Sequence, residues 1–188
     1  YNGYWKDVGT LESYWEANME LIDIIPEFNL YEEYWKIFTK SDIITPQYIS
    51  DRAYISRSII GEGVEVHGTV VNSVIGAGVI IEEGAQVRDS IIMQGTHIGK
   101  NTVIQKAIIA ENVVIGDNCL IGEGEYAESK YDKKVYNADI VTIGEKSVIP
   151  RGVTIGKNTA IMGVTLIEDY ENAVLESGDY IVKAGGIR

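Results

Sequence analysis

Residues 73–124 read SVIGAGVIIEEGAQVRD (73–89), SIIMQGTHIGKNTVIQK (90–106) and AIIAENVVIGDNCLIGEG (107–124), and this stretch decides the fold. The aliphatic residues Ile75, Ile92 and Ile109 recur 17 positions apart. Further aliphatic residues divide these repeats into steps of six, six and five: Ile81, Val87, Ile98, Ile104, Ile115 and Ile121. Such a step fits neither the period of a helical face nor the alternation of a plain strand. The stretch therefore predicts a coil that turns a corner after each short strand, with three strands to each turn.

Small residues and glycines accompany these aliphatic anchors. A small residue stands two positions before each anchor, where it is expected to fit a crowded corner: Ser73, Val79, Ala85, Ser90, Thr96, Thr102, Ala107, Val113 and Cys119. Glycines follow several anchors directly: Gly61, Gly76, Gly99, Gly116 and Gly122. We expect these glycines to adopt tight-turn backbone angles that a Cβ would oppose.

The fold class that this rhythm predicts is mainly β, namely a parallel β-helix of the hexapeptide type. Each coil of such a helix buries its aliphatic face only against the neighbouring coils. Proteins with hexapeptide β-helices wind left-handed, so the left hand follows from this resemblance and not from the usual chirality of crossovers. The alternative, a β-sandwich, is expected to show runs of more variable length and hairpin turns.

The composition limits the classes of partner. The 188 residues suffice for one domain or two small ones, and 45% of them are hydrophobic. Lys and Arg number 16 against 28 Asp and Glu, so the net charge of −12 disfavours nucleic acid and anionic membranes as partners. One cysteine, no apolar run long enough to cross a bilayer and no secretory leader favour a cytoplasmic location. Because the chain starts at Tyr1 without a methionine, we expect it to be a fragment or a processed product.

The aromatic residues indicate a domain boundary. All three tryptophans and both phenylalanines precede residue 39, so residues 1–47 are predicted to be a short helical and extended segment, and residues 48–188 the β-helix. A helix is expected over about residues 10–22, with Thr10 as its cap and an apolar face. That face comprises Leu11, Tyr14, Trp15, Met19 and Ile22. Residues 23–48, which include Pro26 and Pro46, are expected to form an extended connector.

The rhythm is interrupted in two places and ends near Leu166. The interval from Val66 to Ile75 is short, and the polar residues 125–139 are expected to form a loop extruded from one corner. Contacts with partner domains are expected at both places. Regular steps resume at Ile143, Ile149, Ile155 and Ile161, preceded by the small residues Val141, Ser147, Val153 and Thr159. After Leu166 we expect a short hairpin or pair of strands that caps the helix, followed by a Gly-Gly tail.

Three phrases outside the repeat resemble a known enzyme family. YNGYWKDVGT (1–10), LESYWEANMELI (11–22) and TPQYI (45–49) are similar to the bacterial ADP-glucose pyrophosphorylases, or glucose-1-phosphate adenylyltransferases. In that family a nucleotidyltransferase domain is followed by a left-handed β-helix. The resemblance implies that residues 1–47 include the end of the catalytic domain. It also implies transfer of the adenylyl group of ATP to glucose 1-phosphate, which forms ADP-glucose for glycogen synthesis.

The same resemblance implies a metal site. It makes Asp7 one of two aspartates that bind Mg²⁺, for which a carboxylate is a natural ligand. The alternative is that Asp7 only accepts hydrogen bonds from backbone donors near the start of the helix. Lys6 is a candidate for binding substrate phosphate, or else a solvated cation. The second aspartate and the family's glycine-rich nucleotide loop are expected before Tyr1, so this chain alone is expected to be inactive and to contain no catalytic residue.

Two histidines and one cysteine allow other interpretations. A stand-alone hexapeptide acyltransferase would use a histidine as general base, and the candidates are His67 and His97. Both are expected to point outward from a flat face, without a recognisable partner. Cys119 occupies a small corner position, so a buried structural role is expected. The third possibility is a structural subunit without catalytic activity.

Regulation and assembly are also implied by the family resemblance. Its β-helix domain contributes to a homotetramer and to sites for sugar-phosphate or nucleotide effectors. Anionic effectors favour lysine and arginine, and the candidates are Arg52, Arg57, Arg88, Lys130, Lys133 and Lys134. Self-association is expected as well, because a solenoid must cover its last apolar coil.

Overall fold

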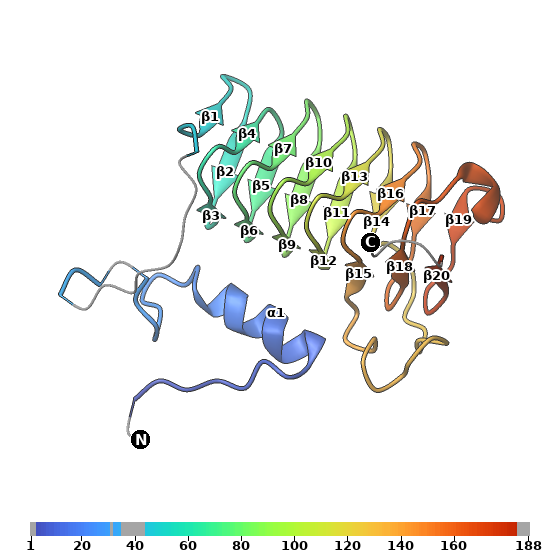
Figure 1. Ribbon diagram of the computed structural model, residues 1–188, viewed down its shortest axis with the longest axis horizontal. Helices are drawn as coiled ribbons and strands as arrows, with labels where there is room; N and C mark the ends of the chain where they lie inside the picture. Colours follow the sequence, from blue (N-terminus) through green and yellow to red (C-terminus); the bar gives the residue numbers. More distant parts are fainter. Residues whose placement is uncertain (1–2, 31, 35–43, 184–188) are drawn as a thin grey trace.

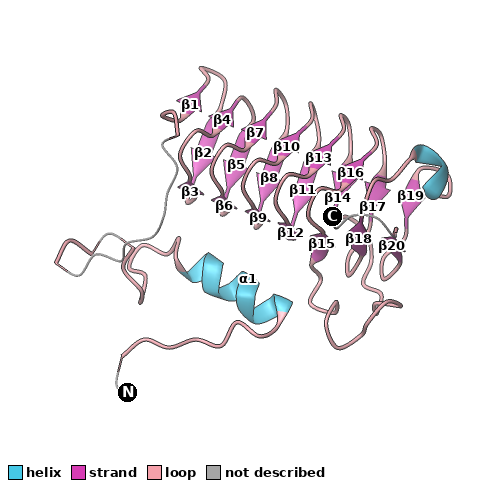
Figure 2. Ribbon diagram, in the orientation of Figure 1, coloured by secondary structure: helices cyan, strands magenta, loops and turns pink. Residues whose placement is uncertain are grey.

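The computed structural model describes residues 3–30, 32–34 and 44–183 (Figure 1). They form one α-helix, α1 (Leu11–Glu20), twenty short strands and a 3-10 helix, η1 (Ile167–Asp169). The strands stack into a solenoid that runs the length of the molecule, with α1 alongside it (Figure 2). The structure is a left-handed parallel β-helix, which confirms the predicted fold class.

Three parallel sheets form the three faces of the solenoid. Sheet A consists of β1 (Tyr48–Ile49), β4 (Glu65–Val66), β7 (Ile80–Ile81), β10 (His97–Ile98), β13 (Val114–Ile115) and β16 (Val148–Ile149). Sheet B consists of β2 (Tyr54–Ser56), β5 (Thr69–Val71), β8 (Gln86–Arg88), β11 (Val103–Gln105), β14 (Leu120–Ile121), β17 (Thr154–Ile155) and β19 (Val174–Leu175). Sheet C consists of β3 (Ile59–Ile60), β6 (Val74–Ile75), β9 (Ile91–Ile92), β12 (Ala107–Ile109), β15 (Val141–Ile143), β18 (Ala160–Met162) and β20 (Tyr180–Val182).

The aliphatic anchors form the core by stacking on one another. Ile75 pairs with Ile92, and Ile92 with Ile109, so each repeat of 17 residues makes one full turn. The small corner residues are buried as predicted, and several also link neighbouring coils. Ser90, for example, donates from Oγ to the carbonyl of Arg88 (2.6 Å) and accepts from the amide of Ala107 (3.0 Å). The buried hydroxyls therefore satisfy backbone groups that the corners would otherwise leave without partners.

The glycines that follow the anchors have a different role from the predicted one. Of those five, Gly122 has a positive φ, of 88°, while the other four do not. At Gly116, a Cβ would instead lie 2.5 Å from the amide nitrogen of Arg151 on the next coil. The prediction was thus wrong for four glycines, because the close spacing of coils excludes a side chain there.

The short interval between Val66 and Ile75 is a reduced corner. Val66 ends β4, and the next inward residue is Val70 in β5, only four positions later. The corner contains Gly68, where a Cβ would lie 2.3 Å from the carbonyl oxygen of Ala85. This corner can therefore be shorter than the others because its backbone lies directly against the next coil.

The end of the chain forms a pair of short strands, one of the two predicted alternatives, and not a hairpin. Both final strands pair in parallel with the preceding coil, β19 with β17 and β20 with β18. They continue sheets B and C because the preceding coil offers unfilled backbone donors and acceptors on both faces. The Gly-Gly tail lies outside the described residues.

The polar loop leaves the corner between β14 and β15 and extends from the solenoid (Figure 1), while part of it is held against the last coils. Ser129 is fully buried, and the amide of Lys130 donates to the carbonyl of Gly178 (2.7 Å). The buried Asn158 holds both ends of the loop, since its Nδ2 donates to Ala127 O (2.8 Å) and its Oδ1 accepts from the amide of Asp139 (2.7 Å). The loop that extends from this corner is therefore also anchored to the last coils.

Helix α1 packs on the outer face of sheet C. Thr10 caps it as predicted, accepting at Oγ1 from the amide of Ser13 (3.1 Å), and the helix ends at Glu20, slightly earlier than expected. Its apolar side chains meet Ile91, Ile108 and Ile140 from the β-helix; they are Leu11, Tyr14, Trp15 and Met19. The described residues between Asp23 and Thr45 contain no helix or strand, and the middle of the predicted connector, 35–43, lies outside the described residues.

Candidate functional site

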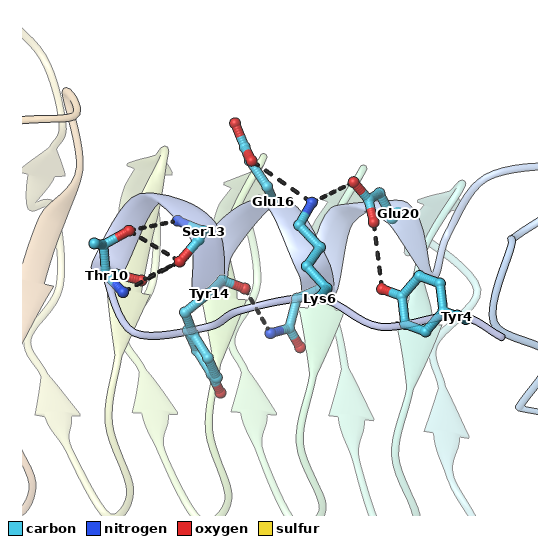
Figure 3. A network of polar contacts seen from close by, with 8 residues as sticks. Tyr4, Lys6, Thr10, Ser13, Tyr14, Glu16 and Glu20 are labelled. Atoms are coloured by element: carbon cyan, nitrogen blue, oxygen red, sulfur yellow. Dashed lines mark hydrogen bonds and ion pairs between the residues drawn. The ribbon is translucent and has the colours of Figure 1, made fainter. Parts of the chain in front are cut away.

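The segment before α1 lies along the helix and is attached to it by polar contacts (Figure 3). The Lys6 ammonium lies 3.6 Å from Oε2 of Glu16 and also pairs with Glu20. The Tyr4 hydroxyl donates to Glu20 (3.4 Å). The hydrogen bond that Lys6 donates to Glu20 raises the pKa of Lys6 above its usual value. Lys6 is thus shared between two carboxylates, and any contact with a substrate phosphate would have to displace them.

Asp7 is exposed in the turn between this segment and the helix. Its Oδ1 accepts a hydrogen bond from the amide of Gly9 (2.9 Å), and no described residue hydrogen-bonds to Oδ2. The helix start itself is satisfied by Thr10 and Ser13, which form a reciprocal capping box. The carboxylate therefore shapes the turn with one oxygen and keeps the other available to a ligand.

Asp7 stands without other metal-ligating side chains nearby. Within the described ranges, no group of three or more His, Cys, Asp or Glu residues could hold a metal ion. A single carboxylate supplies one or two of the six oxygen ligands that Mg²⁺ takes. The described part of this chain thus offers a single carboxylate at this place and does not form a complete metal site.

Large apolar side chains around Asp7 face the outside. Trp5 is 76% exposed, and Val8 on the other side of Asp7 is 52% exposed. Tyr4, in contrast, packs against Phe28 with 5.6 Å between ring centroids. This concentration of exposed apolar surface is typical of a contact surface.

The two histidines lie on sheet A, and both are partly exposed. His97 Nε2 lies 3.2 Å from Oε1 of Glu82, and His67 Nε2 lies 3.9 Å from Oε2 of Glu65. The His67 ring also packs on Tyr48, with 5.5 Å between centroids. Their outward direction agrees with the prediction, but each has an acidic neighbour that the sequence did not reveal.

Cys119 is buried in a corner, as predicted. Its thiol donates toward the carbonyls of Pro150 (3.3 Å) and Gly116 (3.4 Å), and burial raises its pKa. A thiol with a raised pKa is a poor nucleophile at neutral pH. This residue therefore serves the packing of the coils.

The candidate effector-binding cations are spread over several places and mostly face acidic residues. Four make ion pairs: Arg52 with Glu83 (2.9 Å), Arg57 with Asp23 (3.4 Å), Lys130 with Asp179 (2.5 Å) and Lys133 with Glu128 (2.7 Å). Arg88 donates to the side chain of Gln86 (3.1 Å), and Lys134 lies in the same loop as Lys130. The described residues do not bring these six cations together into one anion site.

Sequence reasoning missed two functional features of the structure. Asn158 and Asp89 are polar corner residues whose contacts span several coils, and no local motif distinguishes them from other corner residues. The only signal for Asp89 is its place in the repeat, one coil from Asn72 and one from Lys106.

No described helix is both long and apolar enough to cross a membrane.

The fold and the repeat define the class of this protein. The pattern of the family described as "GlmU-like, C-terminal hexapeptide" matches residues 44–143, and the chain belongs to this family. The match excludes the segment that carries Asp7.

Comparison with curated proteins extends the similarity to that segment. The chain is 65% identical over 98% of its length to a glucose-1-phosphate adenylyltransferase of Lachnospira eligens. It is 48% identical to the enzyme of that name from Fervidobacterium nodosum and 50% identical to that of Thermotoga maritima, each over 97% of the chain. The chain spans less than half of these relatives, 44%, 43% and 43% respectively, and covers their C-terminal part.

Proposed function

We propose that this chain is the C-terminal assembly and regulatory part of a glucose-1-phosphate adenylyltransferase. The complete enzyme transfers the adenylyl group of ATP to glucose 1-phosphate, releases pyrophosphate and forms ADP-glucose for glycogen synthesis. The chain described here is inactive alone, because it contributes a scaffold and one edge of the active site.

The observation that carries this proposal is the similarity of residues 1–47. A hexapeptide β-helix occurs in enzymes of several classes, so the fold alone does not select an activity. The match to the adenylyltransferases covers 98% of the chain and so includes the Asp7 segment, whereas the hexapeptide match begins at residue 44. The N-terminal segment thus separates this proposal from an acyltransferase, and no contact of His67 or His97 favours the latter.

Asp7 is the residue proposed to hold Mg²⁺. Its exposed carboxylate, with one oxygen held by Gly9 N and the other directed away from described partners, fits a hard divalent cation. When bound, Mg²⁺ neutralises phosphate charge and aligns the sugar phosphate for in-line attack at the α-phosphate of ATP. The hydrogen bond from Gly9 orients the carboxylate, and Lys6 holds the segment on α1. The remaining ligands, including a second aspartate, are proposed to belong to the complete enzyme outside this chain.

Assembly, regulation and location form the less direct part of the proposal. The exposed side chains of Trp5 and Val8 support a homo-oligomer, which in the complete enzyme is a homotetramer. A sugar-phosphate or nucleotide effector is proposed to bind in the assembled enzyme, where cations from two subunits or domains can meet. A cytoplasmic location is proposed as well, in line with the low cysteine content of the chain.

The activity is tested by measuring pyrophosphate release from ATP and glucose 1-phosphate with Mg²⁺. We expect turnover by the complete enzyme and none by residues 1–188. Turnover by this chain alone, or acyl transfer from acyl-CoA at a comparable rate, would contradict the proposal.

The role of Asp7 is tested in the complete enzyme with Asp7→Asn. The change should lower kcat/KM by about 100-fold or more and raise the Mg²⁺ concentration at half-maximal rate, because a ligating charge is lost. Glu12→Gln, an exposed carboxylate on the first turn of α1, is the matched control and should leave both quantities unchanged. Equal effects of the two substitutions would exclude a metal-binding role for Asp7.

A further inference from the structure

The apolar contact between α1 and the β-helix does not by itself determine where the helix lies along the coils. No residue of α1 is fully buried, and its apolar face rests on Ile91, Ile108 and Ile140. The first four strands of sheet C present similar aliphatic side chains on this face, namely Ile59, Val74, Ile91 and Ile108, and apolar burial has no direction. A directional contact is needed to prevent the helix from sliding from one coil to the next.

Trp15 makes such a contact. Its indole Nε1–H donates a hydrogen bond to the backbone carbonyl oxygen of Asp89, with a distance of 2.7 Å. The Lys106 ammonium lies 5.5 Å from the centroid of the same ring, within the range of a cation–π interaction. Asp89 and Lys106 occupy equivalent corners of consecutive coils, between sheets B and C. The tryptophan is therefore held at one defined coil.

The acceptor is itself held by the coils on both sides. The Asp89 carboxylate accepts from Nδ2 of Asn72 at Oδ1 and from Nε2 of Gln105 at Oδ2, each at 2.5 Å. Asn72 belongs to the preceding coil, and Gln105 to the following one. The carbonyl that receives the indole hydrogen bond is thus fixed relative to three successive coils.

The backbone of this corner shows that its side chains are adapted to α1. We define the corner column as Arg57, Asn72, Asp89 and Lys106, whose φ angles are 45°, 49°, 49° and 49°. This left-handed region favours glycine and asparagine and is unfavourable for arginine and lysine. Arg57 reaches Asp23 just beyond the end of α1 (3.4 Å), and Lys106 reaches the Trp15 ring. Contact with the helical segment gives both long cations a role that glycine could not fill.

The other side of α1 holds the Asp7 segment. Lys6 pairs with Glu16 and Glu20, which belong to the same helix as Trp15, and Asp7 is only three residues from the Thr10 cap. A displacement of α1 along the β-helix would therefore carry Asp7 with it.

We propose that Trp15 and Asp89 are positioning residues that set the register of α1 on the β-helix, and through α1 and Lys6 the place of Asp7. The inference rests on the proposed function in that it takes Asp7 to be a metal ligand of the complete adenylyltransferase. It connects the scaffold to the metal site by a path of named contacts from Gln105 to Asp89, Trp15, α1 and Asp7.

The register is tested by hydrogen exchange of backbone amides in this chain. Trp15→Phe keeps an aromatic ring but removes the indole donor, so amides of α1 should exchange about fivefold faster while those of β9 and β12 stay unchanged. Trp5→Phe, at a side chain 76% exposed, is the matched control and should have no effect on α1. Unchanged exchange of α1 in the Trp15→Phe variant would overturn the proposed register.

The link to Asp7 is tested by steady-state kinetics of the complete enzyme. Trp15→Phe and Gln105→Ala should each raise the Mg²⁺ concentration at half-maximal rate by about three- to tenfold, with a smaller change in kcat at saturating Mg²⁺. Gln86→Ala, one coil earlier on sheet B, should leave the Mg²⁺ dependence unchanged. A faster exchange of α1 without any shift in Mg²⁺ dependence would refute the link to Asp7. Absence of ADP-glucose synthesis by the unmodified complete enzyme would instead refute the proposed function, and with it the link, while the exchange data would still decide the register.

Discussion

The β-helix, residues 48–183, and the N-terminal segment, residues 3–34, bury their apolar side chains to very different degrees. The anchors Ile81, Ile98 and Ile104 of the β-helix are fully buried, whereas Ile24, Ile25 and Tyr34 of the N-terminal segment are 94%, 89% and 99% exposed. Each coil covers the next, so the repeat supplies its own core. Among the described residues, the N-terminal segment has no comparable neighbour, and it depends on a few directional contacts. The difference separates a self-sufficient scaffold from a segment suited to contact with further protein surface.

The largest expected effect comes from removing one anchor of the β-helix. Ile104→Ala leaves a cavity at a fully buried position and should lower the free energy of unfolding by about 3–4 kcal/mol. The same substitution at Ile24, which is 94% exposed, should change it by less than about 0.5 kcal/mol. Urea denaturation followed by circular dichroism measures both. Similar losses for the two variants would show that the N-terminal segment is as well packed as the β-helix.

A second comparison uses glycines. Gly116→Ala would place a Cβ 2.5 Å from the Arg151 amide nitrogen, and because backbone atoms cannot move aside, we expect a loss of about 2–3 kcal/mol. At Gly9 in the N-terminal segment, a Cβ would lie 3.1 Å from the Asp7 side chain, which can rotate away, so Gly9→Ala should cost less than about 0.5 kcal/mol. The same denaturation experiment distinguishes the two regions. If Gly116→Ala left the free energy of unfolding unchanged, the coils would be able to separate locally.

The pH dependence of stability distinguishes a buried tyrosine from an exposed one. Tyr170 is 4% exposed, its hydroxyl lies 2.8 Å from Oγ1 of Thr165, and burial raises its pKa to about 12. The folded state favours the neutral phenol. The contribution of Tyr170 to the free energy of unfolding is therefore complete below pH 10, and up to about 2 kcal/mol of it is lost as the pH rises toward 12. Tyr170→Phe should therefore be less stable at neutral pH, but its stability should fall less steeply above pH 10. Tyr34→Phe, at a side chain 99% exposed, is the control, and parallel pH profiles for Tyr170→Phe and the unmodified chain would contradict the assignment.

The smallest effect concerns the loop at 125–139, a polar part of the β-helix that is also held by few contacts. Asn158→Ala removes the hydrogen bonds to Ala127 and Asp139, so the loop should open more readily, by about 1–2 kcal/mol. Hydrogen exchange of the loop amides measures this opening. Asn112→Ala has a matching backbone strain, with φ of 56° against 55°, and should leave the loop protected. Equal exchange in the two variants would assign the effect to backbone strain alone.

The local pattern of the sequence predicted the repetitive features correctly. The hexapeptide step, the buried corner at Cys119 and the Thr10 cap all depend on residues close in sequence or related by one coil. The role of Gly116 was misjudged because its constraint comes from Arg151, 35 positions away (151 − 116). After Leu166 the structure has the predicted alternative of a strand pair and not a hairpin, because each short strand pairs with the best available edge, here the preceding coil. The role of Asp7 remains a prediction from family resemblance, because the described residues do not group it with two further possible metal ligands.

Periodicity alone determined that this chain forms a parallel β-helix, because each anchor needs only an identical neighbour one turn away. Resemblance in YNGYWKDVGT, again readable from residues alone, separated the adenylyltransferases from other hexapeptide proteins. Only the tertiary structure decided that α1 lies on sheet C at the Asp89 corner and that Asn158 closes the loop. Those contacts join side chains to single backbone carbonyls 74 and 31 residues away. Hydrogen bonds of that kind produce no repeating pattern of residues in the sequence.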